Sequence, residues 1–209
     1  MTELTQQVAE ANGFSKTTIE VVHGQVERLA LKEKADVVLC DWAGPALLHG
    51  GMHRSFLQAR RRLLKPGGIV LPSRAELFVT GIEDRQALAA LSKQWQNISG
   101  FDYGSAMSTV VTTPRLATLS LASQVCTSSE KVADLADLSS VTLQAMETGL
   151  KGMLFELKCL RDERLFGLMV HHDLSFGLPG QEDVAVLSSN PLSHHKLLLN
   201  FPRGILVKK

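Results

Sequence analysis

The amino-acid sequence predicts an α/β unit followed by an antiparallel β unit, with the division near Pro72. Before Pro72, a buried-strand pattern, an amphipathic helix and a further short strand follow one another, as in an α/β sandwich. After it, several segments alternate apolar and polar residues with a period of two, which is typical of an antiparallel sheet or barrel. The 209 residues suffice for one domain or two small ones with a buried core.

Two helices and three strands are expected in the first unit. The run Ala35–Cys40 is almost continuously apolar, as in a strand buried on both faces of a parallel sheet. Met52–Leu64 carries apolar residues at helical spacing, and the following Lys-Pro-Gly-Gly ends the helix. The other elements are a helix over Leu4–Asn12, stopped at Gly13, and strands over Thr18–Val22 and Ile69–Leu71.

In the second unit the alternating pattern predicts four strands and one inserted helix. The helix covers Gln86–Trp95 and lies between the first two strands. The strands are expected over Ala75–Ile82, Leu116–Cys126, Met153–Leu160 and Arg164–Phe176.

The charge balance is close to neutral. Lys and Arg number 22 and Asp and Glu 21, so the net charge is +1. Such a balance implies neither a nucleic-acid partner nor a membrane surface. The local run Arg60-Arg61-Arg62 is expected to be the solvated face of a helix, with a nucleic-acid contact as the minor alternative.

Cysteine and histidine usage points to a reducing compartment and to no metal site. Cys40, Cys126 and Cys159 lie far apart and form no metal-type pair, so we expect small buried thiols. Adjacent residues on a strand point to opposite faces, so neither His171-His172 nor His194-His195 makes a ligand set. The sequence shows no signal-peptide pattern and no apolar run of membrane-spanning length. We therefore expect a cytoplasmic or nuclear protein.

The loop Cys40–Met52 carries the most specific motif of the chain. It reads Cys-Asp-Trp-Ala-Gly-Pro-Ala-Leu-Leu-His-Gly-Gly-Met. This resembles the double-glutamate loop of the protein arginine N-methyltransferases, Ser-Glu-Trp-Met-Gly-x-x-Leu-Leu-x-Glu-x-Met. Asp41 stands at the first glutamate and Gly50 at the second. In that family the two carboxylates hold the planar guanidinium of the substrate arginine, so Asp41 and Gly50 are the altered catalytic positions.

Further blocks resemble the same family, in its order and with similar spacing. Gly24-Gln25-Val26-Glu27 is similar to the Gly-x-Val-Glu block, whose valine backbone and glutamate side chain hold the adenine of S-adenosylmethionine. Ser193-His194-His195-Lys196 is similar to the Thr-His-Trp loop, with His194 at the family histidine and His195 at the tryptophan. The other matching blocks are Ala59-Arg60 with Leu63–Gly68, Pro72–Ala75 with Ile82–Arg85, and Trp95, Asn97 and Gly100–Asp102.

The resemblance implies a fold and a division of the chain. Residues 1–72 would form the C-terminal half of a class I S-adenosylmethionine-dependent methyltransferase domain, which is Rossmann-like. Residues 73–209 would form a partial antiparallel β-barrel, with a helical dimerisation arm at about 85–112. The cofactor implied is S-adenosyl-L-methionine, with Val26, Glu27 and Met52 as candidate cofactor-binding residues.

Other parts of the family pattern have no counterpart in these 209 residues. The glycine-rich motif and the acidic residue that grips the ribose are both missing, which predicts that the chain alone does not bind the cofactor. Two strands that would lie between Thr18–Val22 and Ala35–Cys40 are missing as well. We expect a truncated gene model or fragment, or a degraded paralogue that another chain completes.

Several functions stay open at this point. The leading expectation is a member of the arginine methyltransferase family that does not transfer methyl groups by itself. The rival is a non-catalytic subunit that binds an active arginine methyltransferase as its partner chain, and a third is an active enzyme whose sequence extends beyond both ends. Serine-hydrolase and phosphate-loop motifs are absent.

The candidate residues also have simpler interpretations. Glu27 could be a solvated loop acid, Asp41 could cap a turn, and His194 could be an ordinary polar residue. Met52 and Phe56 fit a helix core as well as a site.

Overall fold

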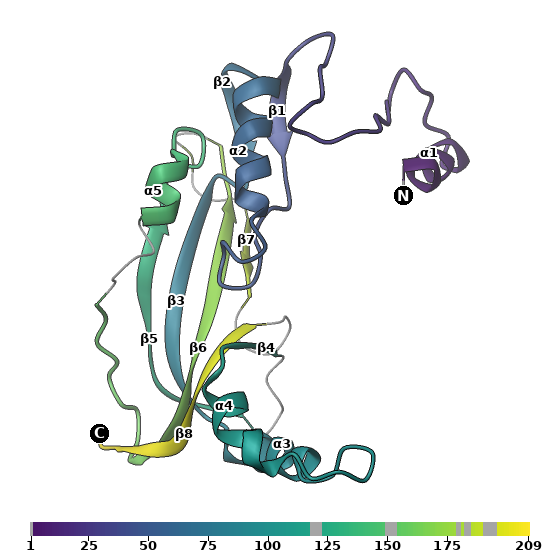
Figure 1. The fold of residues 1–209 in the computed structure, drawn as a ribbon. Coiled ribbons are helices and arrows are strands. Elements are labelled where there is room, and N and C mark those ends of the chain that lie inside the picture. The colour runs from purple at the N-terminus through teal and green to yellow at the C-terminus, as the bar shows by residue number, and fades with distance from the viewer. Residues whose placement is uncertain (1, 118–122, 149–153, 179–180, 182–184, 190–195) are drawn as a thin grey trace.

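The computed structural model describes residues 2–117, 123–148, 154–178, 181, 185–189 and 196–209. A long antiparallel sheet forms the body of the molecule (Figure 1). Helix α2 and strands β1 and β2 lie at one end of this sheet, and helices α3 and α4 lie at the other. Helix α1 stands apart, joined to β1 by an irregular segment.

The α/β unit contains the two helices expected and two of the three strands. Its elements are α1 (Thr2–Ala11), β1 (Ala35–Leu39), α2 (Met52–Leu63) and β2 (Leu64–Leu71). Strands β1 and β2 pair in parallel, as predicted. Strand β2 begins where α2 ends, because Leu64 already has extended backbone angles and Gly67 adopts a positive φ of 74°.

Two expectations for this unit are wrong. Thr18–Val22 forms no strand, because the described residues provide no neighbouring strand to accept its backbone hydrogen bonds. Strand β1 is not buried on both faces: Val37 is 46% exposed and Leu39 71% exposed. Among the residues that the structure describes, β1 pairs with β2 alone, and the face that carries Val37 and Leu39 is exposed to solvent.

The β unit is an open antiparallel sheet. Its strands follow the order β4-β8-β6-β3-β5, with β7 paired to β6, and in the described residues the sheet does not close. The longest pairing joins β3 to β6 over nine register positions without a bulge, from Arg74↔Ser175 to Ile82↔Gly167. The strands are β3 (Arg74–Glu83), β4 (Arg115–Ala117), β5 (Gln124–Leu135), β6 (Glu163–Phe176), β7 (Ala185–Ser188) and β8 (Lys196–Val207).

Strands β3 and β6 match their predicted segments, whereas two other segments differ. The expected strand Leu116–Cys126 is divided between β4, which pairs with β8, and β5, which pairs with β3. Of Met153–Leu160, residue 153 lies outside the described residues. The rest is not a strand and makes one isolated bridge, Cys159 to Thr127, beside β5.

The helices of the second unit are short, and one was not predicted. Helix α3 (Arg85–Trp95) confirms the expected insert, and η1 (Gly104–Ala106) and α4 (Met107–Thr112) continue the segment predicted as an arm. Helix α5 (Leu143–Thr148) is an addition. No helix in the described part of the chain is long and apolar enough to cross a membrane.

One hydrophobic core joins the two units. The Trp42 and Phe56 rings stack with centroids 5.3 Å apart, and both side chains are buried. Leu77 of β3 and Met146 of α5 belong to the same cluster. Since burial of one such side chain contributes roughly 1.5–3 kcal/mol, this contact fixes α2 on the sheet. The domain division at Pro72 stays a prediction, and the core extends across it.

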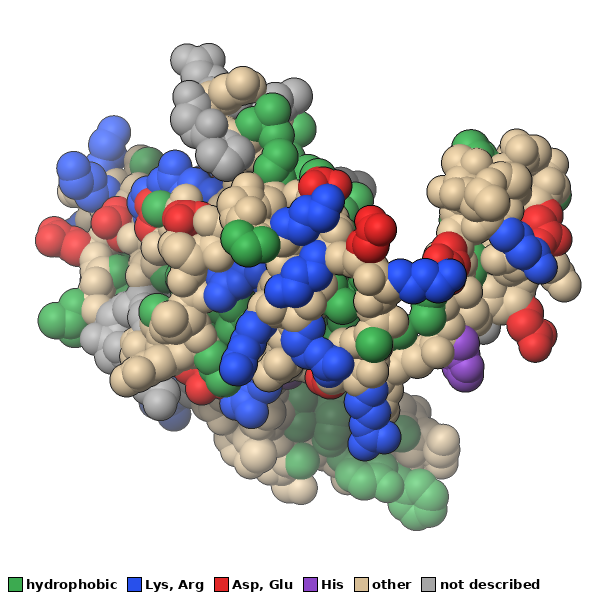
Figure 2. Space-filling model, turned by 90° about the horizontal axis from the view of Figure 1, so that it is seen from above, with side chains coloured by type: hydrophobic (Ala, Val, Ile, Leu, Met, Phe, Trp, Pro, Cys, Tyr) green, Lys and Arg blue, Asp and Glu red, His purple; other side chains and the backbone are tan. Residues whose placement is uncertain are grey.

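The basic run of α2 is only partly solvated. Arg61 and Arg62 are exposed. Several Lys and Arg side chains gather on the face of the molecule that Figure 2 shows. Arg60 is half-buried, and its Nη1 donates to the Leu138 carbonyl at 2.7 Å. Burial lowers the pKa of the Arg60 guanidinium. Arg60 therefore links α2 to the segment before α5 rather than lying on a solvated face.

Candidate functional site

The loop between β1 and α2 is tightly folded. The Gly44 N–H donates to the Leu47 carbonyl at 2.9 Å, and a Cβ at position 44 would lie 1.9 Å from the His49 carbonyl oxygen, so this position requires glycine. Ala46 and Leu47 adopt positive φ angles of 50° and 67°, which are uncommon outside glycine. Leu47 is fully buried, so its side chain anchors the loop in the core.

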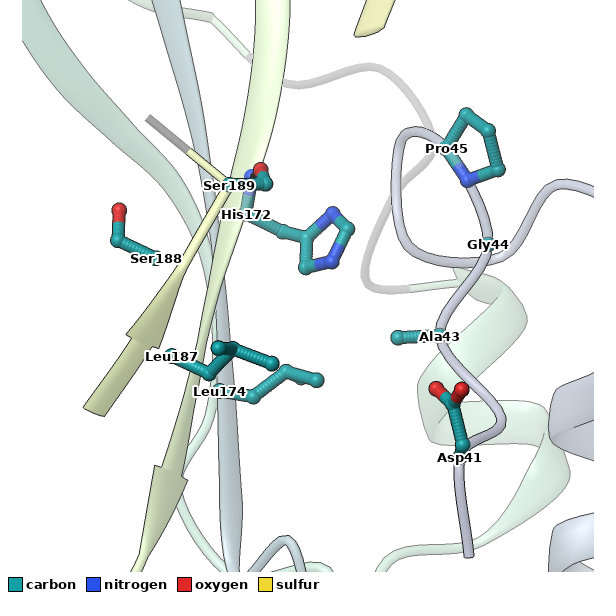
Figure 3. Close-up of a pocket in the computed structure, with 9 residues that line it drawn as sticks. All are labelled: Asp41, Ala43, Gly44, Pro45, His172, Leu174, Leu187, Ser188 and Ser189. Carbon is teal, nitrogen blue, oxygen red and sulfur yellow. Dashed lines mark hydrogen bonds between the residues drawn. The ribbon is translucent and has the colours of Figure 1, made fainter. Parts of the chain in front are cut away.

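This loop and the sheet enclose a pocket of about 300 Å³ (Figure 3). Asp41, the altered first glutamate of the motif, lies on the loop side. His172, from β6, projects towards the loop from the sheet side, and the Leu174 and Leu187 side chains point the same way. The full lining is Asp41, Ala43, Gly44, Pro45, His172, Leu174, Leu187, Ser188 and Ser189.

The pairing of β6 with β7 holds the sheet wall of the pocket. The His172 N–H donates to Ser189 Oγ at 2.7 Å, and the Ser189 N–H donates to the His172 carbonyl at 2.8 Å. The Ser188 hydroxyl donates to the Asp173 carboxylate, and Ser188 points away from the loop in Figure 3. This wall is therefore fixed by backbone and side-chain hydrogen bonds.

The histidine pair of β6 divides between the two faces of the strand, as the alternation predicts. His171 is buried, stacks on Phe78 with centroids 5.2 Å apart, and places its Nε2 3.1 Å from Ser129 Oγ. His172 lines the pocket on the opposite face. Only one histidine of the pair therefore reaches the candidate site.

Gly50, the altered second glutamate, is not among the residues that line this pocket. Its φ is +89°, and an added Cβ would meet nothing within 4 Å. The position is followed by Gly51, also with a positive φ, of 76°. The structure thus brings Asp41 to a pocket and leaves Gly50 outside it.

The candidate cofactor residues lie elsewhere on the α/β unit. The Glu27 carboxylate accepts a hydrogen bond from the Ser55 hydroxyl of α2, and this bond is the main cause of a lowered pKa for the Glu27 carboxyl. Val26 is half-buried, and Met52 is 50% exposed rather than part of the core. None of the three lines the pocket beside Asp41.

These residues do not make a cofactor site by themselves. The Glu27 carboxylate is exposed and already bonded to Ser55, and the segment that carries Val26 and Glu27 contains no strand. The sequence supplies no glycine-rich turn to approach the rest of the cofactor.

Only part of this site could be predicted from the sequence. Asp41 is predicted from the motif and lines the pocket. His172 enters the sequence prediction only as half of a histidine pair that makes no metal site, and Leu174, Leu187 and Ser189 do not enter it. The alternation along β6 carried a signal, since it places His172 and Leu174 on one face. The remaining candidate, His194, lies outside the described residues.

Comparison with known proteins defines the class to which this fold and loop belong. The family described as the arginine methyltransferase oligomerization subdomain matches residues 73–196, more than half of the chain. The methyltransferase domain family matches residues 1–71. The α/β and β units therefore correspond to a methyltransferase joined to an oligomerisation sheet. The chain belongs to the protein arginine methyltransferase family.

Curated relatives extend well beyond the matched region. Protein arginine N-methyltransferase 1 of Dictyostelium discoideum is 29% identical over 84% of this chain and 50% of its own length. Protein arginine N-methyltransferase 6 of Danio rerio is 33% identical over 83% of this chain and 50% of its own length. The chain thus spans about half the length of the curated relatives that it matches.

Solved structures share the fold at low sequence identity. The Trypanosoma brucei PRMT1 enzyme-prozyme heterotetrameric complex with AdoHcy contains a chain with a TM-score of 0.80 and 23% identity. That match covers 99% of the present chain and 64% of the other. Arabidopsis thaliana protein arginine methyltransferase 10 matches with a TM-score of 0.75 and 20% identity, over 100% of this chain and 67% of the other.

Proposed function

We propose that this chain is a non-catalytic member of the arginine methyltransferase family, which acts as a subunit beside a catalytic arginine methyltransferase. The proposal rests on the two substitutions in the double-glutamate loop, at positions 41 and 50. Asp41 provides one short carboxylate at the pocket, and Gly50 provides none. A guanidinium has five N–H donors in a rigid plane and is held best by two carboxylates.

The expected cost of this loss is large. A hydrogen bond to a charged group is worth roughly 1.5–3 kcal/mol, so removal of one carboxylate lowers a rate by one to two orders of magnitude or more. The left-handed backbone at Gly50 supports the same conclusion, because a glutamate is strained there. Asp41 would then hold one edge of a guanidinium without its second clamp.

Cofactor binding is also proposed to be absent from this chain alone. Glu27 is the one acidic side chain at a family adenine position, and it is engaged with Ser55 of α2. An isothermal titration with S-adenosylhomocysteine tests this directly, and the expected result is no heat of binding. A measurable heat would favour the alternative of an active enzyme.

The partner chain is inferred from the oligomerisation region. Phe101, at the end of the α3 segment, is 69% exposed, and the neighbouring Ile98 and Tyr103 are exposed as well. An exposed apolar group of this kind is typical of a protein–protein contact. A fold relative is part of an enzyme-prozyme heterotetramer in Trypanosoma brucei. We propose that residues 85–112 form an arm that docks on a catalytic arginine methyltransferase, in the cytoplasm or the nucleus.

Methyl transfer and co-purification test the proposal. The purified chain is mixed with radiolabelled S-adenosylmethionine and a Gly-Arg-rich protein, and we expect no labelled product. Co-expression with a full-length arginine methyltransferase should give a stable complex. Labelled product from the chain alone contradicts the proposal, as does a stable lone monomer that binds no such enzyme.

A further inference from the structure

The near-neutral net charge of the whole chain conceals a local charge asymmetry. Residues 27–36 and 60–65 carry seven Lys and Arg against three Asp and Glu, a net charge of +4. The other residues carry 15 Lys and Arg against 18 Asp and Glu, a net charge of −3. A surplus of one sign confined to a small part of a protein attracts partners of the opposite charge.

The fold brings these two basic segments together at the carboxyl end of α2. The Arg62 Nη2 donates to the Leu29 carbonyl at 3.0 Å, and the Lys65 Nζ donates to Asp36 Oδ1 at 2.7 Å. Figure 2 looks onto the end of the molecule that carries α2, β1 and β2, and Lys and Arg side chains gather there. We call the six exposed cations of the two segments the basic surface: Arg28, Lys32, Lys34, Arg61, Arg62 and Lys65.

Four cations of the basic surface have no compensating carboxylate. Lys65 is paired with Asp36, and Arg28 is adjacent to Glu27 in the chain. The other four make no ion pair within the described part of the chain. A ligand with several closely spaced negative charges relieves the repulsion among unpaired cations. These four are Lys32, Lys34, Arg61 and Arg62.

The surroundings of the basic surface favour a phosphate backbone over other polyanions. Residues 15–41 and 57–77 contain no Phe, Trp or Tyr, the residues that anchor protein–protein contacts and stack on unpaired bases. A guanidinium matches two oxygens of one phosphate, so arginine suits contacts to a nucleic-acid backbone. A duplex presents one such charge per about 1.7 Å of its axis and needs no stacking partner.

We propose that the basic surface binds the phosphodiester backbone of double-stranded nucleic acid without sequence preference. This activity is separate from the proposed subunit function, because residues 85–112 lie at the opposite end of the sheet (Figure 1). The chain can therefore hold nucleic acid at one end while the other end contacts a catalytic chain. Cations at the carboxyl end of α2 also offset the helix dipole, so the test must separate binding from stability.

The affinity of the purified chain for a labelled DNA duplex, measured by fluorescence anisotropy, tests the proposal. We expect a dissociation constant on the order of 10⁻⁶ M at about 50 mM salt. Four neutralised phosphates give a slope of about −3.6 for log K against log salt, so binding weakens about 150-fold at fourfold higher salt. A slope near zero, or no binding at the lower salt concentration, overturns the proposal.

Other polyanions identify the class of ligand. An RNA duplex of the same length distinguishes RNA from DNA as the source of the backbone, and preference for either duplex supports the proposal. Poly-glutamate of equal total charge represents an acidic protein, and vesicles that contain phosphatidylserine represent a membrane surface. We expect both to bind about tenfold more weakly than the duplex. Binding of either one as tightly as the duplex overturns the assignment to nucleic acid.

Charge variants locate the site within the molecule. The triple variant Lys32→Gln, Lys34→Gln, Arg61→Gln removes three of the four contacts, so the slope should fall in magnitude by about 2.7. Its circular dichroism spectrum and cooperative unfolding should match those of the wild type. Glu33 is exposed between the two lysines, and Glu33→Gln should tighten duplex binding because it removes a repulsive charge. Weaker binding by Glu33→Gln contradicts the location of the site.

A second triple variant controls for the loss of net charge. Lys93→Gln, Arg203→Gln, Lys208→Gln removes three exposed cations from α3 and the end of β8, which lie far from α2 in Figure 1. We expect its affinity for the duplex to stay within about threefold of the wild-type value, since no phosphate contact is lost. Equal loss of binding in both triple variants overturns the proposal, because net charge rather than the basic surface then determines binding.

Discussion

At the scale of single residues, the loop after β1 combines substituted motif residues with left-handed backbone angles. Gly50 has a φ of +89° and lies outside the pocket that Asp41 lines. A side chain in the left-handed region costs about 1–2 kcal/mol, so the backbone here is adapted to glycine. The family's second carboxylate therefore cannot be restored at position 50 without strain.

Substitution of Gly50 tests this point. We expect Gly50→Glu and Gly50→Ala each to lower the free energy of unfolding by about 1 kcal/mol, since both place a Cβ at a positive φ. Neither should gain methyl transfer. Urea denaturation gives the stability and a radiolabel assay gives the activity. Wild-type stability in the glutamate variant would show that the loop relaxes and that the backbone is no obstacle.

The sequence predicts Asp41 as a site residue, but it does not predict that His172 lies in the same site. Asp41 follows a buried strand pattern and stands in a recognisable motif, so the sequence places it at the carboxyl end of β1. His172 faces it from a strand more than a hundred residues away in the chain. Periodicity assigns His172 to one face of β6, but the contact depends on how α2 and the sheet pack together.

At the scale of elements, an ion cluster crosses β3 and β5. Arg74 donates to Asp134 from both Nε and Nη2, at 3.0 and 2.5 Å, and Lys131 bonds Glu76 at 2.8 Å and Asp134 at 2.9 Å. The hydrogen bond from Arg74 is the main cause of a lowered pKa for the Asp134 carboxyl. The cluster therefore reinforces an outer pair of strands.

The pH dependence of stability should report this cluster. A carboxyl pKa lowered by folding adds stability above the unfolded-state value of about 3.9, and that stability is lost as the pH falls through the folded-state pKa. Asp134→Asn should lower the free energy of unfolding by about 0.5–1 kcal/mol at neutral pH. The difference from wild type should vanish on acidification.

The control for Asp134 is Asp36→Asn, which breaks one ion pair with Lys65 at a side chain 79% exposed. It should change stability by less than about 0.5 kcal/mol. A difference for Asp134→Asn that is constant across the acid range would mean that charge is not its cause.

Helix α5 provides a second test at this scale. Met146 is fully buried in the core shared with Phe56 and Leu77, whereas Leu143 on the same helix is 38% exposed. Met146→Ala should cost about 2–5 kcal/mol of unfolding free energy, and Leu143→Ala less than about 1 kcal/mol. Similar losses in thermal or urea unfolding would contradict the packing of α5 on this core.

The sequence predicted elements with strong local patterns and missed those that depend on neighbours. Helix α2 and strands β3 and β6 carry clear periodicity and formed as expected. Thr18–Val22 has strand propensity but no partner strand among the described residues. Strand β8 contains Pro202 and Gly204, which usually interrupt strands, and it forms because β6 and β4 pair with it.

At the scale of the whole molecule, two of the exposed apolar groups lie at opposite ends of the sheet. One is the open side of β1, and the other is the end of the α3 segment, at the opposite end of the sheet (Figure 1). The proposed arm uses the second of these. Its aromatic residue Phe101 is 69% exposed, and the Phe101 backbone pairs with Ile98 in the same segment.

The arm is tested by Phe101→Asp. Because Phe101 is 69% exposed, the variant should keep the stability of the wild-type chain but lose co-purification with a catalytic arginine methyltransferase. Leu154→Asp is the matched control, at a leucine 99% exposed and outside residues 85–112. If Phe101→Asp still co-purifies as the wild type does, the arm is not the contact.

The most direct test of the central claim is methyl transfer in a complex with a disabled partner. The chain is co-purified with a full-length arginine methyltransferase whose double-glutamate loop carries glutamine in place of both glutamates, and with the unmodified enzyme as reference. Transfer of a radiolabelled methyl group to a Gly-Arg-rich protein is then measured. The account predicts product with the unmodified partner and none with the disabled one. Product in the disabled complex would contradict it, because the methyl transfer would then belong to this chain.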